Sequence, residues 1–269
     1  MLEPVNQCTA RELWTRIENF ALDMPEGVIA TDGDGTLWSG DVGEDLFRAF
    51  VDQDLLRPEA VDALRRVARV HRLSDAGTGP EVARRIYSAY LDGRFPEDCV
   101  CEVMTWCYAG LTVDEICTFA RGVVEGANIA SRIHDEMRYL LDRARSARIR
   151  VLLVSASPNY SIAEAAKHFG LLEPDLVTAH ARVIDGILQA EIERPIPYGA
   201  GKVTRLREAI GPACPVVAAF GDNVFDLAML SEAGIRVAVR PKPRLRAMVA
   251  DVHGLVELAA ASTPLHAGS

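Results

Sequence analysis

The chain has 269 residues, of which 49% are hydrophobic and 25% charged, so it can bury the core of one sizeable domain or two modest ones. Its formal net charge of -9 argues against an electrostatic grip on nucleic acid or anionic lipid, and favours a small molecule as partner. No apolar run reaches the roughly 20 residues of a membrane span, and the first ten residues lack the basic region of a secretory signal, so we expect a cytoplasmic protein.

The first predicted elements are a helix and a buried strand. Residues 10–23 carry apolar side chains at helical spacing, and we expect this amphipathic helix to pack against the edge of a sheet. The sequence PEG at residues 25–27 ends the helix. The apolar run VIATDGDGTLW at residues 28–38 then predicts a strand whose carboxyl end delivers Asp32 and Asp34.

A long stretch without strand signals follows. From about residue 43 to residue 148 the apolar spacing is helical, and turn sequences with proline or glycine interrupt it. This is more chain than one crossover connection needs. We therefore predict a separate helical cap domain of residues 43–148, inserted into a core domain of residues 1–42 and 149–269.

The remaining segments alternate between strand and helix, as in a doubly wound, mainly parallel α/β sheet. The predicted elements are a strand at 150–156, a helix at 159–170, a hairpin at 176–192 that turns at Asp185-Gly186, a helix at 202–210, a strand at 216–220, a helix at 225–233 and a strand at 235–239. The predicted fold class is therefore α/β, with a Rossmann-like core and an inserted all-helical cap.

Polar side chains stand where three of the predicted strands end. Asp32, Ser155 and Asp222 each follow an apolar run. Open α/β sheets bind ligands beyond the carboxyl ends of their strands, so we expect these side chains to converge on one site. Lys202, at the start of a predicted helix, is expected to reach the same site from a neighbouring loop.

The closely spaced carboxylates Asp32 and Asp34 indicate a metal. Two carboxylates held this close repel each other unless a cation lies between them. Their oxygen atoms suit a hard cation, and Mg²⁺ fits best. Taken alone, the sequence Asp-Gly-Asp-Gly is also an ordinary polar turn, so the metal hypothesis depends on the other motifs.

The four motifs together resemble those of the haloacid dehalogenase superfamily. They are Asp-x-Asp-x-Thr at residues 32–36, Ser155, Lys202 and Gly-Asp-x-x-x-Asp at residues 221–226. Members of this superfamily are mostly phosphohydrolases that form an aspartyl-phosphate, and the resemblance covers nearly the whole chain. The predicted insertion matches the class in which a cap closes over the site and selects the substrate. The resemblance implies Mg²⁺-dependent hydrolysis of a small phosphorylated metabolite.

The resemblance and the chemistry of the side chains suggest roles for the acidic residues. Asp32 would be the nucleophile, and Asp34 would protonate the departing alkoxide. The metal ligands would be a carboxylate oxygen of Asp32, the backbone carbonyl of Asp34, and Asp222. Dehalogenases of this fold do not keep the second aspartate, so Asp34 favours phosphoryl transfer.

The other motif residues would support the phosphoryl group and the metal. Ser155 and Lys202 would bind phosphoryl oxygens, and Lys202 would offset the negative charge that develops there. Asp226 would lie just behind the metal ligands. Thr36 would assist from the turn after the nucleophile.

Further segments resemble the phosphoserine phosphatase-like branch of the superfamily. They are VSASPNY at residues 154–160, AGIRVAVRPKPRL at residues 233–245 and the pair Gly40-Asp41. In phosphoserine phosphatases a glutamate shortly after the first motif binds the substrate ammonium, and here Asp41 or Glu44 could take that role. The fourth motif departs from the usual pattern of this branch, which leaves phosphoserine itself open as the substrate.

Two alternatives remain open. A phosphocholine-type substrate would bind to aromatic faces, each worth about 0.5–2 kcal/mol. The candidate aromatic residues are Trp38, Tyr87, Tyr90, Trp106 and Tyr108. Arg84 or Arg85 could instead bind a substrate carboxylate. Of these cap residues, Arg85 and Trp106 are expected to take part in selecting the substrate. The second alternative is a non-catalytic protein that uses this fold to bind phosphorylated metabolites.

Overall fold

A parallel sheet forms the core of the computed structural model, which describes residues 7–249 and 252–261. All neighbouring strands in this seven-stranded sheet are parallel. Their spatial order is β1 (Gln7–Cys8), β9 (Leu255–Leu258), β8 (Ala233–Val239), β7 (Val216–Gly221), β2 (Val28–Thr31), β3 (Arg150–Pro158) and β4 (Leu176–Ala179). The α/β fold class predicted from the sequence is confirmed.

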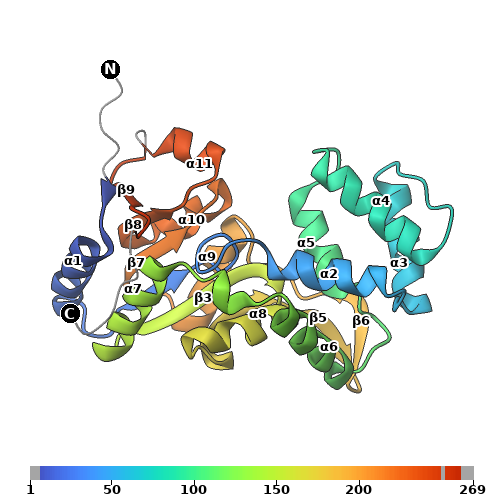
Figure 1. The fold of residues 1–269 in the computed structure, drawn as a ribbon, viewed down its shortest axis with the longest axis horizontal. Coiled ribbons are helices and arrows are strands. Elements are labelled where there is room, and N and C mark those ends of the chain that lie inside the picture. Colours follow the sequence, from blue (N-terminus) through green and yellow to red (C-terminus); the bar gives the residue numbers. More distant parts are fainter. Residues whose placement is uncertain (1–6, 250–251, 262–269) are drawn as a thin grey trace.

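Helices cover both faces of this sheet (Figure 1). One face carries α1 (Ala10–Leu22), α7 (Asp135–Ser146) and α8 (Asn159–Ala166). The opposite face carries α9 (Ala200–Ile210), α10 (Leu227–Ser231) and α11 (Pro243–Met248). Successive strand residues point to opposite faces, so Leu153 joins the first hydrophobic cluster whereas Leu152 and Val154 join the second.

The first helix lies on a face of the sheet, which corrects the expectation that it packs against an edge. Leu13 and Ile17 of α1 are fully buried, in the same cluster as Val217 and Phe220 of the central strand β7. The edge is formed by β1, which pairs with β9. Neither of these short strands was predicted, because two to four residues are too few to show a period.

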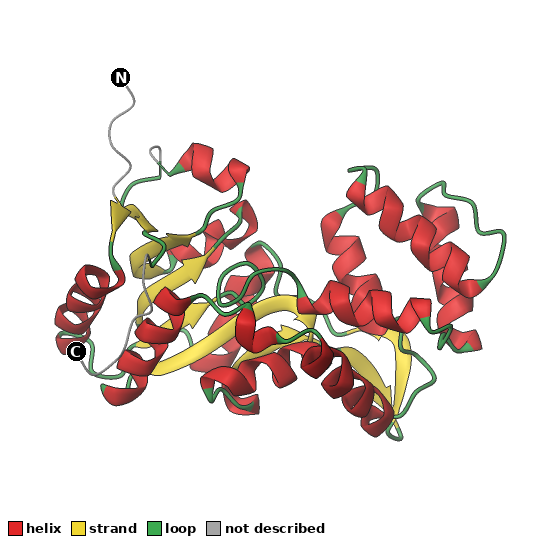
Figure 2. Cartoon of the chain, viewed as in Figure 1, coloured by secondary structure: helices red, strands yellow, loops and turns green. Residues whose placement is uncertain are grey.

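Five helices between β2 and α7 form a separate group at one end of the molecule (Figure 2), with their own hydrophobic cluster. They are α2 (Val42–Asp52), α3 (Pro58–Val70), α4 (Gly79–Leu91), α5 (Glu97–Trp106) and α6 (Val113–Gly126). Thr78 and Thr112 begin α4 and α6 with capping boxes, in which the threonine side chain and a glutamate three residues later satisfy each other's backbone amides. These five helices are called the helical insertion below.

Two segments lie outside the domain to which the sequence assigned them. Met137 and Leu140 of α7 are buried in the cluster that covers the sheet, so the last helix of the predicted cap, residues 43–148, packs with the core. Conversely, Ala181 and Leu188 were assigned to the core domain, but they are buried in the hydrophobic cluster of the helical insertion. The helical insertion therefore packs against a hairpin supplied by the core domain.

That hairpin consists of β5 (Ala181–Ile184) and β6 (Ile187–Ile192). It turns at Asp185 and Gly186, as predicted, and both residues have a positive φ, of 51° and 78°. The predicted start at residue 176 was wrong, because β4 joins the main sheet beside β3. The hairpin contacts the insertion through backbone hydrogen bonds of Leu188 to Gly110 and Leu111.

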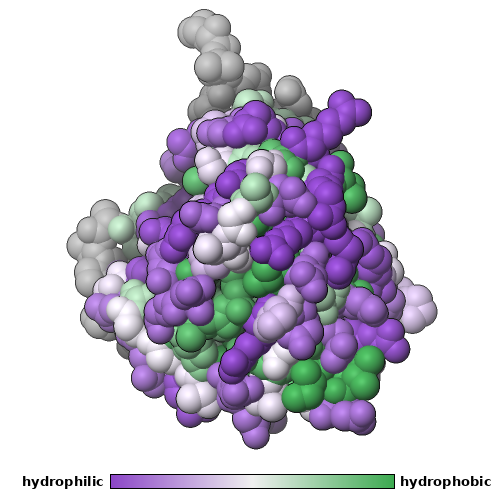
Figure 3. All heavy atoms as spheres, turned by 90° about the vertical axis from the view of Figure 1, so that its right-hand side faces the viewer, coloured by the Kyte–Doolittle hydropathy of each residue, from purple (hydrophilic) through white to green (hydrophobic). Residues whose placement is uncertain are grey.

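No helix within the described ranges combines the length and the hydropathy that a membrane span requires. Viewed from the end that carries the helical insertion, the surface is mainly hydrophilic, and its hydrophobic side chains are gathered in a few patches (Figure 3).

Candidate active site

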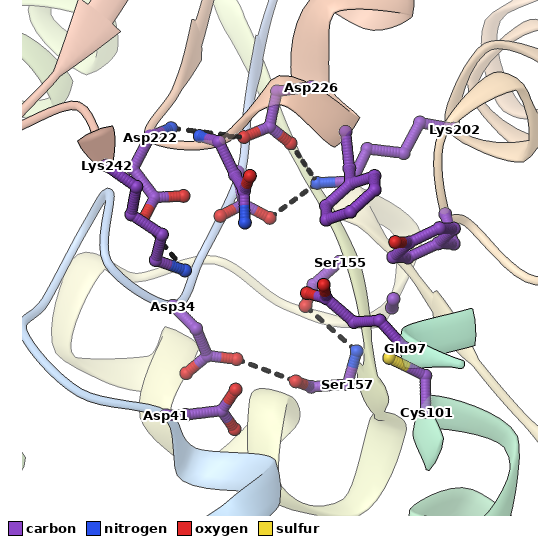
Figure 4. A pocket seen from close by; sticks show the side chains of 15 residues that line it. Asp34, Asp41, Glu97, Cys101, Ser155, Ser157, Lys202, Asp222, Asp226 and Lys242 are labelled. Atoms are coloured by element: carbon purple, nitrogen blue, oxygen red, sulfur yellow. Dashed lines mark hydrogen bonds and ion pairs between the residues drawn. The ribbon is translucent and has the colours of Figure 1, made fainter. Parts of the chain in front are cut away.

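Three adjacent strands bring the predicted site residues together. β2 lies between β7 and β3 in the sheet, so the carboxyl ends of these parallel strands are neighbours. Asp32, Asp222 and Ser155 stand at these ends, and Lys202 reaches the same place from α9. The four side chains line one cavity of about 80 Å³. Figure 4 shows Ser155, Lys202 and Asp222 around it.

Lys202 lies at the centre of a buried ion-pair network. Its Nζ is 2.6 Å from Asp32 Oδ1 and 2.5 Å from Asp226 Oδ1. Burial opposes a charged lysine, but Asp226 and Asp32 raise the pKa of Lys202 above its ordinary value. Burial also raises the pKa of Asp32, and the ammonium of Lys202 opposes that rise. Lys202 is therefore held as a cation against the nucleophile proposed from the sequence.

Asp226 orders the loop that follows β7. Its Oδ2 accepts hydrogen bonds from the backbone amides of Asp222, at 3.1 Å, and Asn223, at 2.9 Å. Gly221 has no room for a side chain, because an added Cβ would lie 2.5 Å from the Cβ of Asp226. Asp226 thus positions both Asp222 and Lys202.

Asp34 is held by donors from three different segments. Its Oδ1 accepts from Trp38 Nε1 and from the backbone amide of Val42, both at 2.8 Å, and its Oδ2 accepts from Ser157 Oγ at 2.7 Å. Burial raises the pKa of Asp34, although these hydrogen bonds oppose the rise. The side chain lies beside Asp41 and Ser157, below the cluster around Lys202 (Figure 4).

Thr36 connects the nucleophile loop to a buried histidine. Its hydroxyl donates to Asp32 Oδ2 at 3.3 Å, and its backbone carbonyl lies 2.9 Å from Nδ1 of His134. Burial lowers the pKa of His134, so the neutral ring donates its Nδ1 proton to that carbonyl. The sequence gives no signal for this link, because the two residues are 98 positions apart.

The acidic side chains fit a divalent cation. Asp32, Asp222 and Asp226 each offer a carboxylate oxygen, and these oxygens lie within 4.8 Å of one another. Among the described residues that line the cavity, six are acidic and only Lys202 and Lys242 are basic. The excess negative charge and the oxygen donors both favour a hard cation such as Mg²⁺.

Several residues of the cavity were not predicted. Lys242 Nζ lies 3.2 Å from Asp222 Oδ2, and Ser157 binds Asp34. Both lie near the carboxyl end of a strand, as the motif residues do, since Ser157 is the last residue but one of β3 and Lys242 comes three residues after β8. Glu97, the first residue of α5, has no such signal.

A smaller recess of about 40 Å³ extends the cavity toward the helical insertion. Asp41 and Glu97 line both spaces, and Glu44 and Tyr90 line the recess. Asp41 caps α2 by accepting from the amide of Glu44 at 2.8 Å, and Glu44 accepts from the Tyr87 hydroxyl at 2.8 Å. Burial raises the pKa of Asp41 and of Glu97. Asp41 and Glu44, which the sequence left as alternatives, both lie here.

Arg85 and Trp106 do not line the cavity or the recess, contrary to the prediction that they select the substrate. Arg85 Nη1 donates to the carbonyls of Ser74, at 2.7 Å, and Ala76, at 3.1 Å, and so holds the loop before α4. Trp106 is buried in the hydrophobic cluster of the insertion. Of the aromatic residues considered for a quaternary ammonium, Tyr90 is the one among the described lining residues.

The motifs and the sheet agree with a family match. Residues 29–231 match the haloacid dehalogenase-like hydrolase family. The chain belongs to this family. This confirms the resemblance drawn from residues 32–36, Ser155, Lys202 and residues 221–226.

Relatives of this hydrolase agree with the phosphoserine phosphatase-like branch. Phosphoserine phosphatase SerB1 of Mycobacterium tuberculosis (strain ATCC 25618 / H37Rv) is 31% identical over 123 residues, which cover 45% of this chain and 39% of that protein. The match therefore spans well under half the length of this curated relative.

Solved structures share the fold. A protein of unknown function from Bordetella pertussis Tohama I has a TM-score of 0.65 and 22% identity, covering 86% of this chain and 97% of that one. A substrate-bound phosphoserine phosphatase has a TM-score of 0.52 and 14% identity, covering 86% of this chain and 92% of that one. At these identities the likeness shows the fold of this hydrolase alone.

Proposed function

We propose that this hydrolase cleaves phosphomonoesters of small metabolites, with Mg²⁺ and through an aspartyl-phosphate on Asp32. The observation that carries the proposal is the buried ammonium of Lys202 beside Asp32, in a cavity that Ser155 also lines. A phosphoryl group in this cavity would meet a nucleophile, a cation and a hydroxyl donor together. The named phosphoserine phosphatase among the relatives supports the same chemistry.

The reaction needs two steps at phosphorus. In the first, a carboxylate oxygen of Asp32 attacks phosphorus, the ester P–O bond breaks, and the leaving oxygen takes its electron pair and a proton from Asp34. In the second, water attacks the phosphoryl-enzyme, Asp34 accepts a proton from that water, and phosphate leaves Asp32 as a carboxylate again. The burial that raises the pKa of Asp34 favours the protonated form that the first step requires.

Ser155 and Lys202 bind the phosphoryl oxygens in this scheme. Ser155 Oγ accepts from the amide of Ser157 at 3.1 Å, which orients its own hydroxyl proton for donation to a phosphoryl oxygen. Lys202 supplies a fixed positive charge, because Asp226 holds it from behind. Both groups are placed before the substrate arrives, so little reorganisation is needed during the reaction.

Mg²⁺ would be held by Asp32, the backbone carbonyl of Asp34, and Asp222. When bound, it neutralises charge on the phosphoryl oxygens and allows an anionic nucleophile to approach an anionic substrate. Asp226 has hydrogen bonds to both of its oxygens, which supports a role behind the ligands for that residue.

Turnover of p-nitrophenyl phosphate tests this proposal. The protein should hydrolyse it in Mg²⁺, and excess EDTA should remove the activity until Mg²⁺ is restored. Asp222→Ala should lose turnover and Mg²⁺ affinity together, the latter measured by calorimetric titration, while the fold survives because the change also removes charge repulsion.

The matched control is Asp62→Ala, which removes an exposed carboxylate from α3 and should change neither quantity. Near wild-type turnover in excess EDTA would contradict the metal assignment. Phosphate binding without turnover of any ester would instead favour a non-catalytic binding protein.

The recess favours a substrate whose alcohol part carries an ammonium group. Asp41, Glu44 and Glu97 give it three carboxylates, whereas the described lining residues include no arginine for the carboxylate of phosphoserine. Its 40 Å³ hold about three water-sized groups, at roughly 10–15 Å³ each. An aminoethyl group has that size, whereas the trimethylammonium of phosphocholine is larger. A phosphomonoester of a short amino alcohol is therefore the substrate that fits best.

A substitution of Glu97 tests this substrate class. Wild-type protein should prefer 2-aminoethyl phosphate to propyl phosphate, which has the same shape without the charge. Glu97→Gln should reduce that preference in kcat/KM about tenfold, or about 1.4 kcal/mol, because an amide attracts the ammonium less than a carboxylate does. Phosphoserine and phosphocholine complete the panel of substrates.

The neighbouring variant Asp98→Asn removes a charge from an exposed residue of the same helix that does not line the recess. It should leave the preference unchanged. If Glu97→Gln slows the hydrolysis of both esters equally, Glu97 does not recognise the ammonium group of the substrate.

A further inference from the structure

Lys242 is a second cation in the cavity, and its setting differs from that of Lys202. Its Nζ lies 3.2 Å from Asp222 Oδ2, yet its side chain is 55% exposed, against 5% for Lys202. Lys202 is enclosed by two carboxylates, whereas Lys242 approaches one carboxylate from the open side of the cavity. An exposed ammonium with a single partner can move to another partner at little cost.

Three carboxylates could hold a metal ion, and Lys242 is the cation that pairs with one of them, Asp222. Asp226 receives Lys202 and two backbone amides, and Asp32 receives Lys202 and the Thr36 hydroxyl. Among the residues that the structure describes, Lys242 is the side chain that forms an ion pair with the carboxylate of Asp222. A metal ion bound to Asp222 would therefore meet the ammonium of this lysine on the same carboxylate.

The backbone around Lys242 is fixed while its side chain is long and flexible. Lys242 stands between Pro241 and Pro243, whose rings restrict φ, and its amide donates to the carbonyl of Asp222 at 2.8 Å. Arg240, just before this segment, pairs with Glu136 at 2.8 Å. The start of the side chain thus stays beside Asp222, and rotation of its four-carbon chain can carry the ammonium into the cavity.

We propose that Lys242 and Mg²⁺ are alternative partners of Asp222, and that Lys242, once displaced, binds a phosphoryl oxygen of the substrate. This rests on the function proposed above. An ammonium and a divalent cation on one carboxylate repel each other, and a phosphoryl dianion in the same cavity is the nearest anion that could receive the lysine. Lys202 and Lys242 would then bind the phosphoryl group from the floor and the open side of the cavity.

Titration with Mg²⁺ alone, followed by calorimetry, tests the competition without any turnover. Lys242→Met should bind Mg²⁺ about tenfold more tightly than wild type, because the competing ammonium is gone. Lys242→Arg keeps the charge and should stay within about threefold of wild type. Arg244→Met is the matched control, since it removes an exposed charge two residues away, in the helix that Lys242 caps, and should leave Mg²⁺ affinity unchanged. Unchanged or weaker binding by Lys242→Met overturns the proposal.

Titration with inorganic phosphate in saturating Mg²⁺ tests the second position of the lysine. Lys242→Met should bind phosphate about tenfold more weakly, and Lys242→Arg should restore most of the affinity. Unchanged phosphate binding by Lys242→Met overturns the proposal even if Mg²⁺ binds more tightly. Failure of the wild-type protein to hydrolyse any phosphate ester would reject the proposed function instead, and would leave the Mg²⁺ titration interpretable.

Discussion

Asp32→Asn should abolish hydrolysis of alkyl and aryl phosphates alike, by a factor on the order of 10⁴ to 10⁶. The amide is a poor nucleophile, so no phosphoryl-enzyme can form, and the nature of the leaving group makes no difference. Lys202 keeps its ion pair with Asp226 in this variant, so the site should remain folded. Turnover of p-nitrophenyl phosphate and of an alkyl phosphate measures the loss.

Direct detection of the phosphoryl-enzyme tests this substitution more sharply than turnover does. Acid-quenched wild-type protein should carry a phosphoryl group on the peptide that contains Asp32, as seen by mass spectrometry, and Asp32→Asn should carry none. Thermal unfolding of both proteins checks that the loss is chemical rather than structural. A variant that still becomes phosphorylated would move the nucleophile to another residue of the cavity.

Asp34→Asn should instead cause a loss that depends on the leaving group. A positioned acid contributes about 100- to 10,000-fold, and an alkoxide departs poorly without its proton. The p-nitrophenolate ion is stable at neutral pH, so the first step with the aryl ester should suffer far less. The second step also uses Asp34, so the aryl ester should show a burst of p-nitrophenol followed by slow turnover.

The contacts of Asp34 make this substitution a clean test. An asparagine oxygen can still accept from Trp38 Nε1 and the Val42 amide, and the amide nitrogen can donate to Ser157 Oγ in place of the present bond. Asp62→Asn changes an exposed carboxylate of α3 that lines neither the cavity nor the recess, and should not separate the aryl from the alkyl esters. Equal loss on both esters without a burst would mean that Asp34 holds the loop and transfers no proton.

The order of motifs along the chain was enough to assemble the centre of the site. Asp32, Ser155 and Asp222 each follow an apolar run, and parallel strands end at one edge of a sheet, so their convergence follows from local pattern and topology. Lys202 was found in the same way, from its place at the start of a helix. The α/β core and the helical insertion likewise have periodic signals that a single sequence reveals.

Only the tertiary structure decided which side chains surround that centre. Arg85 and Trp106 have side chains that could bind a substrate. In the folded insertion, however, Arg85 binds the loop before α4 and Trp106 is buried in the hydrophobic cluster. Glu97 reaches the cavity from the start of α5 in the helical insertion, where the sequence carries no strand-end signal. Periodicity shows which face of an element is buried, whereas the partner of that face depends on long-range packing that leaves no mark in the local pattern.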